Sequence, residues 1–303
     1  MKDNINTWMI SSFLAANLLA TGTFASTLCT STSTYDDHKT TNSSQWDGGN
    51  GDEGYCALTP DSMLLKVYEF GLCTGASSPT DKSNCTTLFE SAAGTTVDLA
   101  VGVSASLTDN ISLIEGTYTN AYLVLSNVTS LKSIMEFDTP RTDFDGNTGK
   151  FCYTDGRSVD DDEDSIMTCS NSAVGATHSV ETINFYDWQT GNHTSQVPNY
   201  QATVAGTSTT TDLYMIKSDG QLSGRFEDDF AIYGDQTLAQ PVTISPSTTA
   251  LDLGISVTNG VSFGFYEPGD NGENGTGGCA LGTTDGCPGD SLFNGLKFVI
   301  SAS

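Results

Sequence analysis

The sequence DSMLLKVYEFGLC occupies residues 61–73 and is the first stretch of the chain that can enter a hydrophobic core. Its apolar side chains alternate, with Met63, Leu65 and Val67 on one face and Leu64, Tyr68 and Phe70 on the other. A period of two residues is that of a β-strand. A strand that is apolar on both faces is typical of a central position, with protein packed over each side.

The composition of the whole chain favours strands that are separated by turns. Its 303 residues include 31 glycines and 11 tyrosines, threonine and serine are abundant, and only 16% of the residues are charged. Such a mixture forms pleated strands and tight turns more readily than helices. We therefore predict an all-β protein, an antiparallel β-sandwich that is either one large unit or two smaller ones.

The charge balance argues against several classes of partner. The chain has 11 lysine and arginine residues against 37 aspartate and glutamate residues, a formal net charge of −26. A surface of this sign repels the phosphates of nucleic acids and the anionic faces of membranes. It favours solubility, cation binding or a salty medium that screens the repulsion.

The N-terminus has the features of an exported protein. Residues 1–25 combine a basic Lys2, an apolar segment and small residues at Thr23 and Ala25, as a secretory signal peptide does. Residues 26–60 are polar and rich in glycine and aspartate, which predicts a flexible acidic leader. Since no later stretch of about 18 apolar residues occurs, we expect no membrane span after cleavage, and a secreted, periplasmic or cell-surface location.

The rest of the chain divides into two strand-rich ranges, residues 61–175 and 176–303. The first range ends in an acidic loop from residue 138 onward, and each range is interpreted as half of a sandwich or as a domain. The predicted strands are Met63–Leu72, Thr86–Glu90, Thr95–Val101, Ala105–Leu107, Thr117–Leu125, Leu131–Phe137, Glu181–Trp188, Tyr200–Val204, Asp212–Ile216, Phe230–Tyr233, Gln240–Ile244, Ala250–Val257, Val261–Tyr266 and Asn294–Ser301.

Two short motifs carry a resemblance to a known family. The first is GTTVDL at residues 94–99, and the second is EGTYT at residues 115–119, which runs into a strand ending at Leu125. In this order they resemble transthyretin-like (prealbumin-type) β-sandwich domains of secreted bacterial proteins, over residues 61–137. The resemblance implies a sandwich fold and supplies no catalytic residues.

The chain contains eight cysteines, an even number, as expected for disulfides in an exported protein. Proximity in the sequence favours three loop-closing pairs and leaves a fourth. These pairs are Cys73–Cys85, Cys152–Cys169, Cys279–Cys287 and Cys29–Cys56. The cysteine and histidine spacings do not fit a zinc site.

Two acidic loops are candidate calcium sites. The segment DFDGN alternates oxygen donors around a glycine, as calcium loops do, and VDDDEDS concentrates negative charge that a cation would neutralise. The candidate ligands are Asp143, Asp145, Asn147, Asp160, Asp162 and Asp164. A third acidic group, Glu267, Asp270 and Glu273, lies in the last loop. The alternative for all of them is a set of solvated acidic loops without metal.

The sequence offers little for catalysis. The chain has three histidines (His38, His178 and His193), and it lacks the GxSxG nucleophile elbow. Its many acids allow carboxylate pairs of the glycosidase type, and Trp46 and Trp188 could stack on a sugar. Ordinary structural roles remain the alternative for each of these residues.

We therefore predict a non-catalytic exported protein of the cell envelope or surface, with a structural or adhesive role and no organic cofactor. It could associate with itself through exposed strand edges, or bind surface glycans. The alternatives are a carbohydrate-binding module or sugar-active enzyme, and a calcium-stabilised binding protein.

Overall fold

The computed structural model describes residues 27–34, 53–100, 114–159, 167–183, 185–187, 192–204, 207–248, 251–269, 279, 286–293 and 295–302. In these ranges the chain is all-β, as predicted, and its helical segments are two 3-10 turns, Ala173–Gly175 (η1) and Phe226–Asp228 (η2). The same ranges contain no helix of the length and apolar character that a membrane span requires. The predicted signal peptide lies outside the described residues.

The largest sheet contains nine of the described strands. They are β3 (Ser62–Cys73), β4 (Cys85–Ala100), β5 (Gly116–Ser126), β6 (Val128–Lys132), β9 (Ser158–Val159), β11 (Ser179–Thr182), β14 (Gln196–Val204), β15 (Thr207–Ile216) and β16 (Ala231–Ile244). Their order is β14-β15-β16-β5-β3-β6-β11-β9, and β4 pairs with β3 outside this path. The pairs are antiparallel except β11–β9.

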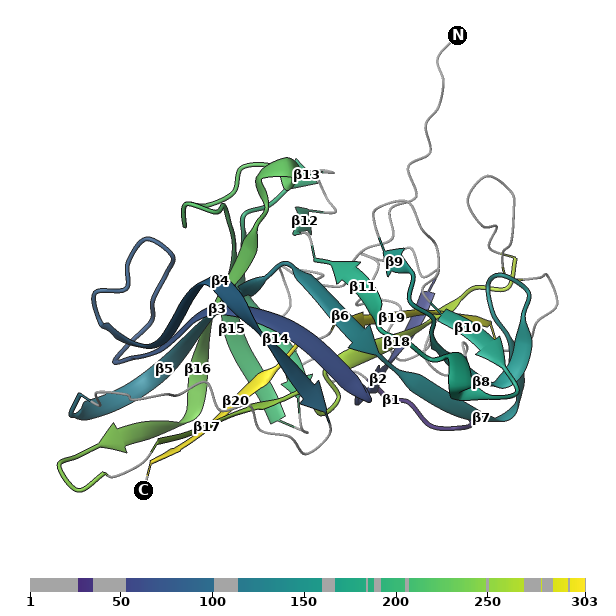
Figure 1. Cartoon of the computed structure of the whole chain (residues 1–303), viewed down its shortest axis with the longest axis horizontal. Helices are drawn as coiled ribbons and strands as arrows, with labels where there is room; N and C mark the ends of the chain where they lie inside the picture. The colour runs from purple at the N-terminus through teal and green to yellow at the C-terminus, as the bar shows by residue number, and fades with distance from the viewer. Residues whose placement is uncertain are drawn as a thin grey trace, which may run out of the picture.

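Strand β3 lies at the centre because both of its edges are paired. One edge pairs with β4 from Ser62 to Cys73, and the other pairs with β5 and, nearer the N-terminus of β3, with β6. Only Asn127 separates β5 from β6, so the sheet divides there into a branch through β16 and a branch through β11. Figure 1 shows the first branch on the left and β6 and β11 toward the middle.

A β-bulge in β3 changes which of its residues share a face. The pairing register shifts between Val67 and Glu69, so Tyr68 is an extra residue. Phe70 therefore lies in the main core with Met63. The predicted position of Phe70 on the opposite face is wrong, because a single inserted residue reverses the alternation of all that follow.

Four smaller sheets complete the described fold. One has the order β1 (Thr27–Leu28), β2 (Glu53–Leu58), β18 (Val261–Tyr266), β19 (Cys287–Phe293), and a second has the order β10 (Met167–Ser170), β8 (Thr148–Thr154), β7 (Ile134–Thr142). The others are the pairs β17 (Leu251–Ser256) with β20 (Lys297–Ala302), and β12 (Tyr186–Asp187) with β13 (Asn192–His193). Strands β1 and β2 are parallel.

Of the four hydrophobic clusters in the described residues, the two largest link different sheets to one another. The main core lies on the inner face of the large sheet and includes residues of β17, β18, β19 and β20, whereas the second core joins β2 and β18 to β7, β8 and β10. Val261 belongs to the main core, and Phe263, the next residue on the same face of β18, belongs to the second. Strand β18 therefore links the two cores, and the architecture is sandwich-like.

Strands from the two predicted ranges pair with each other. Strand β5 pairs with β16, and β6 pairs with β11. Residues 61–175 and 176–303 therefore both contribute strands to the large sheet.

Some strands lie where the sequence predicts loops. Strand β2 falls in the predicted flexible leader, β8 and β10 fall in the predicted acidic loop, and β19 falls in the last glycine-rich segment. These predictions are wrong because each strand is short and surrounded by Gly and Asp, and is stabilised by its partner strand. The predicted strand Leu131–Phe137 is divided at Ser133, and the two predicted strands after residue 230 form one, β16.

Four disulfides join the cysteines in the predicted pairs, the three that sequence proximity favoured and the fourth that was left over: Cys73–Cys85, Cys152–Cys169, Cys279–Cys287 and Cys29–Cys56. In two of them, Cys73–Cys85 and Cys152–Cys169, the cysteines are directly opposed on adjacent strands, β3 with β4 and β8 with β10. Four disulfides fit an oxidising environment outside the cytoplasm.

Gly71→Ala is expected to destabilise the protein, because a Cβ atom at residue 71 would lie 2.6 Å from the Thr86 carbonyl oxygen and still closer to the Tyr122 ring. The backbone of β4 would have to move, at a cost of about 1–3 kcal/mol in the free energy of unfolding. Urea unfolding followed by circular dichroism measures the change. Gly224→Ala is the matched control, because a Cβ atom there meets no atom within 4 Å. Equal losses in both variants would contradict the close packing of β3 against β4 and β5.

Candidate functional site

Strand β4 forms an open edge of the large sheet in the described part of the chain, where it pairs with β3 alone. The other two ends of the sheet are poor templates for strand addition. Strand β9 has only 2 residues, and β14 carries Pro198, a bulge and a positive φ at Asn199. Short strands, prolines and bulges are the features that prevent edge-to-edge association.

Strand β4 is mostly exposed or half-buried, and its two charged residues are acidic. Of its 16 residues, only Leu99 is buried. Glu90 and Asp98 are exposed, and the strand contains no lysine, arginine or proline. Residues 91–94 bulge opposite Tyr68, so the regular register is confined to the two ends, of which Thr95–Ala100 pairs residue for residue with β3. This six-residue segment is the candidate docking edge.

Gly94 ends the bulge and allows it to pack closely on β3. Its φ is +72°, a conformation that residues with a Cβ atom rarely adopt, and a Cβ atom there would also collide with the Lys66 side chain. The Lys66 stem crosses this glycine, and its Nζ lies 5.4 Å from the centroid of the Tyr68 ring.

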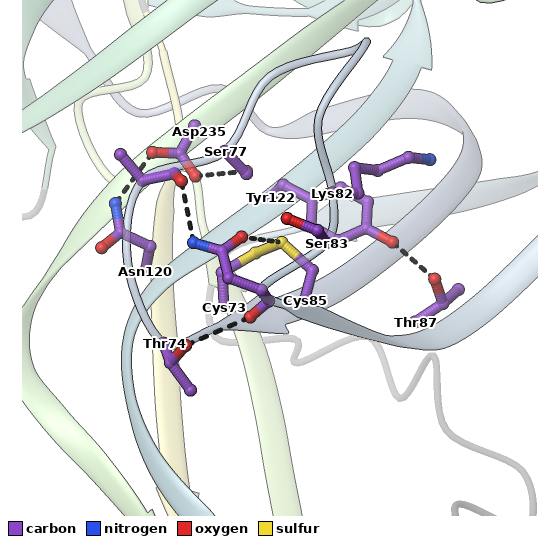
Figure 2. The surroundings of a disulfide bond; sticks show 12 residues. Cys73, Thr74, Ser77, Lys82, Ser83, Cys85, Thr87, Asn120, Tyr122 and Asp235 are labelled. Carbon is purple, nitrogen blue, oxygen red and sulfur yellow. Dashed lines mark hydrogen bonds between the residues drawn. A yellow bond between two sulfur atoms is a disulfide. The ribbon is translucent and has the colours of Figure 1, made fainter.

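The loop that leads into β4 is held at its base by the disulfide Cys73–Cys85 (Figure 2). Within the loop, Asn84 donates from Nδ2 to the Ala76 carbonyl at 2.9 Å, and Thr74 N donates to Asn84 O at 3.0 Å. Hydrogen bonds within the loop therefore fix it together with the disulfide.

Glu69 accepts hydrogen bonds from three side chains on one side of this disulfide. Its carboxylate accepts from Lys82 Nζ at 2.7 Å and from the Tyr122 hydroxyl at 2.6 Å, and it also accepts from Thr87. Burial, followed by the hydrogen bond to Glu69, raises the pKa of Tyr122 above its usual range. The tyrosine is therefore a fixed hydrogen-bond donor and not an acid at physiological pH.

Asp235 has the same role on the other side of the disulfide, where Figure 2 shows Ser77, Asn120 and Asp235 together. Asp235 Oδ1 accepts from Ser77 Oγ at 2.7 Å, and Oδ2 accepts from Asn120 Nδ2 at 2.8 Å. Burial raises the pKa of Asp235, and these two hydrogen bonds act against that shift. Since the groups satisfy one another, this network anchors the loop at the N-terminal end of β4.

A second polar chain lies at the other end of β4. Ser62 Oγ donates to Asp98 Oδ1 at 2.6 Å and lies 2.8 Å from His178 Nε2. A serine hydroxyl has one proton, so with Asp98 as its acceptor it accepts from the Nε2–H of His178. In a catalytic triad the histidine lies between serine and carboxylate. Here the serine lies between the histidine and the carboxylate. The hydrogen bonds of Ser62 therefore join β3 to Asp98 on β4 and to His178, the residue before β11.

His193 is likewise part of a buried pair. Its Nε2 lies 2.9 Å from Asp229 Oδ1, and both side chains are almost fully buried. Burial raises the pKa of Asp229, against the effects of hydrogen bonds from Ser223 and His193. Here the carboxylate lies between serine and histidine, so the order of a catalytic triad is absent in this group too. His38, Trp46 and Trp188 lie outside the described residues, and the sugar-stacking face stays a prediction.

The predicted calcium ligands in the first acidic loop are engaged with protein donors. Asp143 is fully buried and accepts from the backbone N–H groups of Asn147 and Cys169, both at 2.8 Å. Asp145 forms an ion pair with Arg157 at 2.7 Å. The described residues contain no cluster of three or more metal-ligating His, Cys, Asp or Glu side chains. Asp160, Asp162 and Asp164 lie outside the described residues, as do Asp270 and Glu273, and calcium binding there stays a prediction.

Glu181 is a buried carboxyl group that the sequence analysis did not single out. It lies on β11 with 1% of its surface exposed, and its Oε2 accepts from the Phe293 backbone N–H at 2.7 Å. In the described part of the chain, Oε1 has no hydrogen-bond partner, and neither has the hydroxyl of Thr129, its cross-strand neighbour on β6. Burial raises the pKa of Glu181 to about 8, and the bond from Phe293 acts in the opposite direction. Burial therefore places the change of charge of Glu181 near neutral pH.

Comparison with known proteins adds no further information about the site, because no family model, curated protein or solved structure matches the chain. The resemblance of residues 61–137 to transthyretin-like domains therefore stays a prediction.

Glu181→Gln is expected to remove a pH dependence of stability. The folded-state pKa of about 8 lies above the ordinary value of 4.5. The stability contributed by the neutral form is therefore complete below pH 4.5 and is lost as pH rises to about 8. The wild type loses this stability as the pH rises, and the variant does not. The unfolding free energy of the variant minus that of the wild type should therefore increase by on the order of 4 kcal/mol between pH 4 and pH 9.

Urea unfolding at a series of pH values measures this gain. The exposed Glu136 provides the control, and Glu136→Gln should have the same dependence of unfolding free energy on pH as the wild type. If Glu181→Gln also keeps the pH dependence of the wild type, groups other than Glu181 cause it.

Proposed function

We propose that this protein is an exported, non-catalytic component of the cell envelope or surface with a structural or adhesive role, and that it associates through the outer edge of β4. The single observation that carries the proposal is the six-residue segment Thr95–Ala100. It is in regular register with β3 on one side and has no strand on the other within the described chain. An exposed edge of this kind offers backbone donors and acceptors to an added strand.

Both ends of β4 are rigid, which supports a docking role. The disulfide and the Glu69 and Asp235 networks fix one end, and the chain His178–Ser62–Asp98 fixes the other. A preformed edge loses little conformational entropy when a partner strand is added. The four disulfides add support for an extracytoplasmic location.

Charge complementarity favours a basic partner over a second copy. Strand β4 carries Glu90 and Asp98 without a basic residue, and the chain has a net charge of −26. Two copies therefore repel each other, whereas an extended segment with Lys or Arg at alternate positions gains attraction along the edge. The proposed partner is an extended, basic segment of another envelope or surface protein.

A synthetic peptide of alternating threonine and lysine tests the proposal by fluorescence anisotropy. It should bind the wild type, and binding should weaken between about 50 and about 500 mM NaCl. The variant Glu90→Gln/Asp98→Asn should bind about tenfold more weakly, and its new amide group still offers an acceptor oxygen to Ser62. The control Glu136→Gln/Glu227→Gln removes the same charge from exposed positions elsewhere and should have little effect.

A second peptide separates strand addition from charge attraction. Proline in place of threonine removes backbone N–H donors and keeps the lysines, so this peptide should bind more weakly. Amide chemical shifts should change at Thr95–Ala100 with the threonine peptide. Equal affinity for both peptides, or equal losses in both double variants, would contradict docking at β4. If the wild type forms dimers in the absence of peptide, the partner at this edge is a second copy of the chain and not a basic segment of another protein.

A further inference from the structure

A cavity lies between the branch β14-β15-β16-β5 and a crossing segment that comprises Phe293 and residues 295–298. Its apolar lining comes from both sides, with Leu123, Leu213 and Ile232 from the sheet and Phe293, Leu296 and Phe298 from the crossing segment. Figure 1 shows β20 passing beside β16 in this part of the molecule. The cavity is separate from the outer edge of β4, so it is independent of the proposed docking site.

The hollow exists because a glycine interrupts a row of leucines. Gly234 on β16 pairs with Leu123 of β5 on one side and with Leu213 of β15 on the other. Directly opposed residues in antiparallel strands project from the same face of the sheet. The missing side chain between two leucines therefore leaves a gap. A Cβ atom at residue 234 would lie 3.4 Å from Leu213 Cδ2, so even a methyl group occupies part of this space.

The Gln236 side chain in the wall already uses both of its amide protons. It donates to Thr211 Oγ1 at 3.1 Å and to the Leu296 carbonyl at 3.3 Å, and it accepts from the Phe298 backbone N–H at 3.1 Å. These bonds attach the crossing segment to the sheet. A ligand that requires a hydrogen-bond donor or a counter-charge would gain nothing from this amide, which favours an uncharged apolar ligand.

The volume sets the size of the ligand. The cavity measures about 50 Å³, and one water needs roughly 10–15 Å³ on this measure, so the space corresponds to about four waters. An apolar cavity of about 150 Å³ binds benzene or xenon, and the space here is about a third of that volume. We propose that this cavity is a binding site for an uncharged apolar molecule that is smaller than benzene, of about the size of a xenon atom.

Xenon is the probe for the test, with the wild-type protein observed by methyl NMR. Saturating xenon should shift the methyl signals of Leu123, Leu213 and Ile232, and should raise Tm by about 2 °C. Gly234→Ala narrows the cavity and should weaken xenon binding at least about fivefold. Gly224→Ala, at an open position, should bind as the wild type does.

Leu213→Ala provides a second test in case Gly234→Ala folds poorly. It enlarges the same cavity, so it should bind xenon at least as tightly as the wild type and should also accept benzene. The proposal is overturned if saturating xenon leaves the three methyl signals of the wild type unchanged. It is also overturned if Gly234→Ala and Gly224→Ala bind equally well.

Discussion

The pairing of β3 along both of its edges is the constraint on which the rest of the structure depends. Its hydrogen bonds to β4, β5 and β6 leave no edge open, and its side chains supply Met63, Leu65 and Val67 to the main core. Because β5 and β6 share one edge of β3, the sheet must divide between them. The two branches then bring distant segments together, β16 on one side and β11 on the other.

The same constraint explains why the open edge is β4. A strand whose two edges are occupied forces its neighbours outward, and β4 is the neighbour beyond which the described chain adds no further strand. The polar clusters on either end of β4 then have a common role, since Glu69 and Asp235 act at one end and Ser62 at the other. Groups that look catalytic by residue type are used here to hold strands in register.

The sequence predicts the all-β fold and the disulfide pairs because both depend on local information. Alternation in residues 61–73 is visible in the chain, and each cysteine lies near its partner in sequence. The bulge at Tyr68 and the strand β2 depend on partner strands, so alternation alone misplaces them. Glu181 is the clearest limit, because its burial requires β19 to meet β11 across 112 residues. The sequence names candidate acids but does not show which of them is buried.

Native-state hydrogen exchange of the amides of β3 tests this account most directly. If β3 is paired on both edges and packed on its inner face, its amides should exchange only through global unfolding. Their exchange free energies should then equal the free energy of unfolding and be the highest in the protein. Amides of β3 that exchange as fast as those at the outer edge of β14 would contradict the central position of this strand.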